Sequence, residues 1–183
     1  SPVPNFVRYL TPDVKGLRVA VPEELMGSAM DPEVLQRVTE AIERLKEAGA
    51  SIERVKMESF KHGLSAYYIL APAEASANLS RFDGVRYGFR AKEANNLRDM
   101  IKKSRGQGFG PEVLRRIIIG TYVLSSGYYD AFYLKAQQLR TLIKLDFDRV
   151  FQNFDVVLSP TVPTTAFKLG EHSQDPLSMY LAD

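Results

Sequence analysis

The sequence predicts an α/β fold whose strands pair in parallel and are covered on both faces by helices. Strand, helix and strand patterns follow one another within residues 17–57, and a third strand pattern, 155–159, comes after a long helical stretch. A strand, a helix and a second strand form a βαβ unit, in which the two strands lie parallel. Because parallel sheets are normally buried on both faces, the order of the elements predicts the fold class.

The first strand and helix have clear boundaries. Residues 17–21 are β-rich, and Pro22 ends the run because proline lacks the N–H that a sheet ladder needs. Asp31 is a good helix N-cap, Pro32 suits the first helical position, and Gly49 provides a left-handed stop. Spacings of three and four predict that the buried face of this helix consists of Val34, Leu35, Val38, Ile42 and Leu45.

The centre of the chain is expected to be largely helical. After a second strand that includes Ile52, Val55 and Met57, helical patterns cover residues 64–79, 92–104, 113–124 and 129–154. Pro72 is expected to start or kink the first of these helices. In the second, Leu97, Met100 and Ile101 are expected to face inward. Pro111 is expected to restart a helix after a glycine-rich break.

Two local patterns resemble active-site motifs. Residues 106–110 are rich in glycine, like a phosphate-binding loop, but no strand precedes them and no Lys-Ser or Lys-Thr follows. An interhelical turn is therefore the favoured interpretation. Residues 125–127, Ser-Ser-Gly, resemble part of a serine-nucleophile motif, but they lie in a helical pattern and are interpreted as a helix end.

Composition narrows the classes of function. The chain has no cysteine, which excludes disulfides, thiolate metal sites and a cysteine nucleophile. The two histidines, His62 and His172, do not fit a metal-ligand spacing, so no metal site is expected. A net charge of +2 gives no strong field for nucleic acid or a membrane surface. No apolar run approaches the roughly 20 residues that cross a bilayer, and a cytoplasmic protein is expected.

One charge is unusual in its position on the last long helix. Arg140 falls within about 50° of the centre of an apolar stripe, at 100° per residue. A guanidinium near an apolar face must be paired, reach solvent along its own stem, or contact an anionic ligand. Position alone leaves these alternatives open. The stripe consists of Ala136, Leu139, Ile143, Phe147, Val150 and Phe154.

A series of longer strings, in a fixed order, carries a family resemblance. The strings are residues 71–76, 78–88, 108–113, 115–117, 120–121, 127–137, 140–144, 160–164 and 175–180. Together they closely resemble the A subunits of the glutamyl/aspartyl-tRNA amidotransferases, which are members of the amidase-signature family. The match spans nearly the whole chain.

The resemblance implies that residues 1–183 are an internal segment of a single amidase domain, with a mixed sheet between helices. The complete enzymes hydrolyse glutamine to glutamate and ammonia with a serine nucleophile, a bridging serine and a lysine base. A partner B subunit uses the ammonia, ATP and Mg²⁺ to convert Glu-tRNA(Gln) or Asp-tRNA(Asn), and a small C subunit joins the pair. In the family the triad lies before the matched region, so no catalytic residue and no cofactor is assigned to this segment. Alone, it is expected to be inactive.

The resemblance also implies substrate-binding residues. The arginine in the Arg-Thr-Leu-Ile string, here Arg140, is associated with the α-carboxylate of glutamine, which suits the bidentate geometry of a guanidinium. Tyr87, in the Asp-Gly-Val-Arg-Tyr-Gly string, is a candidate to reach the substrate. Thr161 follows the third strand, where α/β sheets usually bind ligands.

Two other functions are considered. The chain could belong to another amidase-signature amidohydrolase that acts on a different amide, but the strings at 81–88 and 128–140 favour an amidotransferase. It could instead be a non-catalytic docking module for the B subunit. Asp175 and Pro176 open a helical pattern only a few residues before Asp183, and this favours a segment of a larger domain over a separate module.

Overall fold

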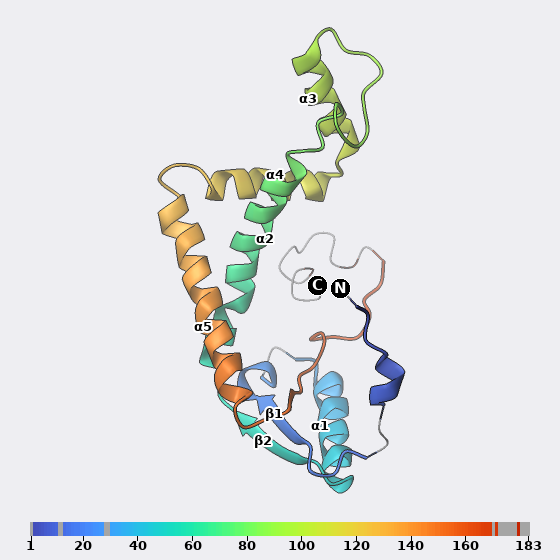
Figure 1. The fold of residues 1–183 in the computed structure, drawn as a ribbon, viewed down its shortest axis with the longest axis vertical. Coiled ribbons are helices and arrows are strands. Elements are labelled where there is room, and N and C mark those ends of the chain that lie inside the picture. Colours follow the sequence, from blue (N-terminus) through green and yellow to red (C-terminus); the bar gives the residue numbers. More distant parts are fainter. Residues whose placement is uncertain (1, 11–12, 28–29, 170, 172–178, 180–183) are drawn as a thin grey trace. The chain divides into compact units, whose positions relative to one another are not determined.

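The computed structural model describes residues 2–10, 13–27, 30–169, 171 and 179 (Figure 1). Its strands and helices alternate at the two ends of the chain, and helices fill the middle. In chain order, the elements are η1 (Phe6–Tyr9), β1 (Arg18–Pro22), η2 (Glu23–Leu25), α1 (Pro32–Glu47), β2 (Ser51–Val55), η3 (Glu58–His62), α2 (Gly63–Leu79), α3 (Leu97–Gly108), α4 (Pro111–Val123), η4 (Tyr129–Leu134), α5 (Lys135–Val150) and β3 (Val156–Val157).

The three strands form one parallel sheet in the order β2-β1-β3. Val19 of the central strand pairs with Ile52 on one side and with Val156 on the other. The parallel α/β arrangement predicted from the sequence is therefore confirmed. The mixed sheet that the resemblance implied for the complete domain stays a prediction.

Apolar clusters cover both faces of the sheet. On one face Val21 packs with Met26 and with Ile42 of α1. On the other face Ala20 packs with Met57 and with Val150 of α5. Successive residues of β1 thus point into different clusters, as the alternation of a strand requires. A parallel sheet with helices on both sides follows from this packing.

Helix α1 forms where its capping residues predicted it. The side chain of Asp31 accepts a hydrogen bond from the Glu33 backbone N–H at 2.8 Å, and Pro32 takes the first helical position. Gly49 follows the helix with φ of +97°, which only glycine adopts without strain. Of the predicted face, Ile42 is buried, and the remaining positions are half-buried: Val34, Leu35, Val38 and Leu45.

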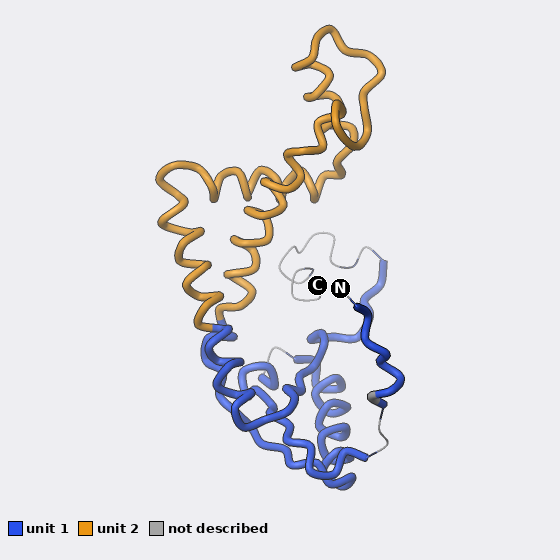
Figure 2. The backbone as a smooth tube through the Cα atoms, viewed as in Figure 1, with its two compact units in different colours: residues 1–61, 143–183 blue, residues 62–142 orange. Residues whose placement is uncertain are grey.

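The chain divides into two compact units (Figure 2). The sheet unit contains residues 1–61 and 143–183, and the helical unit contains residues 62–142, so the boundary falls within α5. In the described part of the chain, no helix has the length and apolar character needed to span a membrane.

Close approach of α2 and α4 organises the helical unit. Gly120 of α4 lies directly against the backbone carbonyl of Pro72 in α2, and a Cβ at position 120 would also stand 2.8 Å from Ser76 Oγ. The absence of a side chain at Gly120 is what permits this approach. Pro72 lies inside α2, so of the two expected outcomes no helix starts at this proline, and a kink there stays a prediction.

The position of α3 differs from the sequence prediction. It begins at Leu97 because the Asn96 side chain caps it, accepting from the Asp99 N–H at 2.9 Å. Leu97 is 63% exposed rather than inward-facing, whereas Met100 is buried. The helix also continues through Gly106 to Gly108, so the expected glycine-rich turn is reduced to residues 109–110.

The expected helix at 129–154 consists of two elements. A π-helical turn, Tyr129–Leu134, precedes α5, and α5 ends at Val150. Before them, residues 125–127 form the turn after α4, as expected of a helix end. The helix expected to open at Asp175 and Pro176 lies outside the described residues.

Candidate functional site

The two ends of the parallel sheet differ in chemistry. At the amino end, Arg18 NH2 lies 2.7 Å from Asp155 Oδ1, and the Arg18 side chain and backbone both donate to Oδ2. These hydrogen bonds from Arg18 lower the pKa of Asp155 to about 2. The ion pair joins the start of β1 to the start of β3. The guanidinium and the carboxylate therefore bind each other at this end of the sheet.

At the carboxyl end, two long-range hydrogen bonds hold the loops that leave the strands. The Met57 N–H, just after β2, donates to both carboxylate oxygens of Glu24 at 3.0 Å. The Asp31 N–H donates to the Pro163 carbonyl at 2.8 Å. These contacts fix the loops that follow β1, β2 and β3 around a shared edge, which is where α/β sheets usually bind ligands.

Thr161 lines a hollow at this edge. The hollow has a volume of about 230 Å³. Its described lining contains no lysine or histidine that could activate a hydroxyl, so Thr161 is suited to hydrogen bonding rather than nucleophilic attack. The lining residues are Glu24, Leu25, Gly27, Met30, Pro160, Thr161, Val162 and Pro163.

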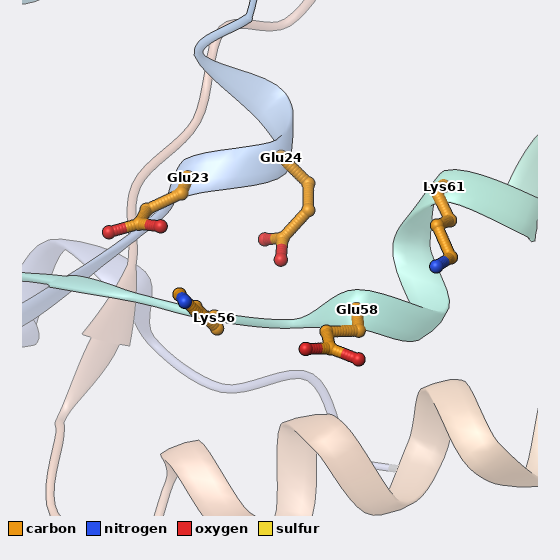
Figure 3. Close-up of a pocket in the computed structure, with 5 residues that line it drawn as sticks. All are labelled: Glu23, Glu24, Lys56, Glu58 and Lys61. Atoms are coloured by element: carbon orange, nitrogen blue, oxygen red, sulfur yellow. The ribbon is translucent and has the colours of Figure 1, made fainter.

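A second hollow, of about 410 Å³, shares Glu24 with the first (Figure 3). Figure 3 shows Glu23 and Glu24 coming from η2, opposite Lys56, Glu58 and Lys61. Among the described residues, no ion pair joins either lysine to a carboxylate. No group of three or more His, Cys, Asp or Glu in the described ranges is placed to hold a metal ion.

Arg140 lies on α5 with its side chain exposed. The structure confirms that two residues of the predicted apolar stripe, Ala136 and Val150, are buried. On the same helix, Gln137 Nε2 donates to Tyr133 Oη of the preceding π-helical turn at 2.8 Å. Within the residues the structure describes, Arg140 has no hydrogen bond or ion pair, so its guanidinium is free there to contact an anion.

Tyr87 lies in the turn between α2 and α3. Its side chain is 54% exposed, and its ring stands 6.0 Å from the ring of Phe82. The sequence motif pointed to Tyr87, but it did not point to the residues that hold this turn in place. Asp83 lies within the turn, while Ser104 and Arg105 of α3 bond to the segments on either side of it.

The three predicted substrate-binding residues are divided between the two compact units. Tyr87 and Arg140 belong to the helical unit, and Thr161 belongs to the sheet unit. Of the two metal-ligand candidates discounted from the sequence, His62 ends η3, and His172 lies outside the described residues.

Comparison with known proteins shows the family of this chain. The family model described as Amidase matches residues 1–183. The chain is 57% identical over 181 residues to the A subunit of glutamyl-tRNA(Gln) amidotransferase from Lysinibacillus sphaericus (strain C3-41). It is 56% identical over 182 residues to the protein of the same name in Geobacillus kaustophilus (strain HTA426). These matches cover 99% and 100% of this chain, but only 37% and 38% of the two relatives.

Solved structures support the same fold. The crystal structure of the glutamyl-tRNA(Gln) amidotransferase A subunit from Thermotoga maritima matches 93% of this chain and 32% of its own, with a TM-score of 0.64 and 39% identity. A bacterial aryl acylamidase of the amidase-signature family matches 90% of this chain and 31% of its own, with a TM-score of 0.63. At 18% identity, the second match concerns the fold alone.

Proposed function

This chain belongs to the amidase family, and we propose that it forms part of the A subunit of a tRNA-dependent amidotransferase. In this proposal the complete protein hydrolyses glutamine, and the released ammonia converts Glu-tRNA(Gln) or Asp-tRNA(Asn) to Gln-tRNA(Gln) or Asn-tRNA(Asn). The observation that carries it is the identity above one half, along almost the entire chain, to two proteins named as such subunits.

Arg140 is the residue to which we assign the α-carboxylate of glutamine. Its exposed guanidinium has no ion-pair partner in the described part of the chain, which supports a ligand contact over an internal pair. A guanidinium binds a carboxylate through two parallel N–H bonds, which fix both distance and orientation. α5 is a continuous helix, so it presents this group from a rigid element.

Tyr87 and Thr161 complete the proposed substrate contacts. Tyr87 offers a half-exposed ring and a phenol that can donate or accept a hydrogen bond. Thr161 offers a hydroxyl in a hollow at the carboxyl edge of the sheet. The hollow of Thr161 holds no lysine or histidine among its described lining residues, and both residues are assigned to binding; the 183 residues alone are not expected to hydrolyse glutamine.

The proposal includes partners. The amidotransferase B subunit would receive the ammonia and use ATP and Mg²⁺, while a C subunit would join the two larger chains in the cytoplasm. Charged tRNA would be reached through this complex, which agrees with the small net charge of +2 on this chain. No cofactor is assigned to the segment itself.

A chimera tests the proposed function directly. Residues 1–183 would replace the matched segment in the Lysinibacillus sphaericus relative, co-expressed with the partner subunits of that enzyme. The chimera is expected to keep glutamine-dependent formation of Gln-tRNA(Gln). A folded chimera that hydrolyses other amides but supports no glutamine-driven transamidation would favour the alternative, an amidohydrolase with a different substrate.

A further inference from the structure

The turn that carries Tyr87 is built around one carboxylate. Asp83 Oδ1 accepts hydrogen bonds from the backbone N–H groups of Val85 at 2.8 Å and Arg86 at 3.0 Å. Its other oxygen accepts from Arg86 Nε at 3.1 Å. The Gly84 N–H then donates to the Tyr87 carbonyl at 3.2 Å. The backbone of Tyr87 is therefore tied into a turn whose N–H groups converge on Asp83.

Helix α3 anchors both sides of this turn. Gly84 has φ of +77°, and a Cβ there would stand 2.7 Å from Ser104 Oγ, so the turn lies directly on the helix. The buried Ser104 hydroxyl accepts from the Ala91 N–H at 2.9 Å. On the other side, Arg105 NH1 donates to the Leu79 carbonyl at 2.8 Å and the Phe82 carbonyl at 3.1 Å.

The hydrogen bonds of the turn favour the ionised form of Asp83. Its side chain is only 16% exposed, and the backbone N–H groups of Arg86 and Val85 lower its pKa to about 2. A carboxylate with three donors is well satisfied, and removing it would leave two backbone N–H groups without their acceptor.

We propose that Asp83 is a positioning residue for substrate binding, because it fixes the turn that presents Tyr87 to the amide substrate. This inference rests on the proposed function and on the proposed role of Tyr87. A half-exposed tyrosine on a loosely held loop loses conformational freedom when a ligand binds, and that loss weakens binding. Asp83 removes this cost by ordering the turn before the substrate arrives.

The test uses the complete amidotransferase and compares two ammonia sources. Asp83→Ala is expected to raise the KM for glutamine about tenfold, equivalent to the loss of one net hydrogen-bond contribution. Transamidation fed by free ammonia should be unchanged, because it bypasses glutamine binding. Asp83→Asn keeps one acceptor oxygen and should give an intermediate KM. Such a graded rescue, with kcat nearly constant, is not expected from a merely structural role.

Asp155→Asn is the matched control. Asp155 is also a carboxylate bonded to an arginine side chain and to a backbone N–H, with a pKa of about 2, but it lies in the sheet unit. The substitution should lower the melting temperature without changing the glutamine KM.

Three outcomes would overturn the inference. The first is an Asp83→Ala variant with an unchanged glutamine KM. The second is an equal fall in the glutamine-driven and ammonia-driven rates, which would indicate a general structural role. The third is an unchanged KM in Tyr87→Phe, which would remove the premise. If Arg140→Lys raises the glutamine KM while the Asp83 and Tyr87 variants do not, the role of Asp83 is wrong but the proposed function stands. If none of these variants raises the glutamine KM, the proposed substrate site is wrong as well.

Discussion

The sheet unit and the helical unit are stabilised by different kinds of packing. In the sheet unit the fully buried residues include large side chains, and Met57, Val19 and Val21 are almost inaccessible to solvent. In the helical unit many buried positions are small, including Ala66, Ala73, Ser76 and Gly120. Its aromatic and aliphatic side chains are often exposed instead, for example Ile118 at 68% and Tyr122 at 49%.

From this difference we expect the two units to respond to different substitutions. Burial of large apolar side chains stabilises a sheet through the area removed from water, so truncation is the most damaging change there. Helices that meet through small residues depend on backbone approach, so enlargement is the most damaging change. The same fold therefore contains one unit that is sensitive to cavities and one that is sensitive to overpacking.

The largest expected effect is a cavity in the sheet unit. Met57→Ala should reduce the free energy of unfolding by about 3 kcal/mol, because Met57 fills the space between Ala20 and Val150. Denaturant unfolding of the full-length protein, with hydrogen exchange of the β1 and β2 amides, measures this. A loss below about 1 kcal/mol would show that the site collapses easily and would weaken the comparison.

Enlargement in the helical unit should have the next largest effect. Gly120→Ala is expected to cost about 2 kcal/mol, because the new Cβ overlaps the Pro72 carbonyl and α2 and α4 must separate. Gly106→Ala is the matched control within α3, since nothing lies within 4 Å of a Cβ there. That control should be neutral or stabilising by about 0.5 kcal/mol. Equal melting temperatures for the two variants would contradict the role of close approach.

The smallest effect concerns acid stability at the amino edge of the sheet. The pKa of Asp155 is lowered by Arg18, so its contribution is present above the unfolded value of about 3.9 and is lost as pH falls toward 2. Asp155→Asn should therefore lower stability at neutral pH and flatten the pH dependence between about 4 and 2. Parallel acid-unfolding curves for the two proteins would argue against a folded-state ion pair.

Local signals in the sequence were sufficient for α1 of the sheet unit. Asp31, Pro32 and Gly49 act through neighbouring backbone groups, so their positions fix α1 without tertiary information. The first two strands were predictable in position but not in length, since β1 includes Pro22, which pairs with Val55, and β2 ends at Val55, before the predicted Met57.

The helical unit was harder to predict because tertiary contacts decide its details. The sequence pattern placed the second of the central helices at 92–104, and only the structure shows that Asn96 caps α3 and that the helix begins at Leu97. Gly106 and Gly108 remain helical despite their low propensity, as tertiary context can override propensity. The hydrogen bonds from Arg105 to Leu79 and Phe82 cross more than twenty residues of sequence, and no local pattern predicts them.

The candidate site was predictable only in part. The fold class placed Thr161 at the carboxyl end of a parallel strand, and the structure has a hollow at that position, while its contact with substrate stays a prediction. The helical periodicity predicted that Arg140 lies close to the apolar stripe. It could not predict whether a carboxylate would pair with Arg140, because that depends on residues distant in the chain. Asp83 was missed because its role is visible only once its three donors are in place.

Arg140→Lys in the complete amidotransferase is the most direct test of the central claim. Lysine keeps the charge but loses the two parallel N–H donors, so roughly 1.5–3 kcal/mol of glutamine binding should be lost, about ten- to more than hundredfold in KM. The ammonia-driven rate and the melting temperature should be unchanged. Arg37→Lys, an exposed arginine of α1, should leave all three quantities unchanged. An unchanged glutamine KM in Arg140→Lys, or an equal loss of both rates with a lower melting temperature, would contradict the account.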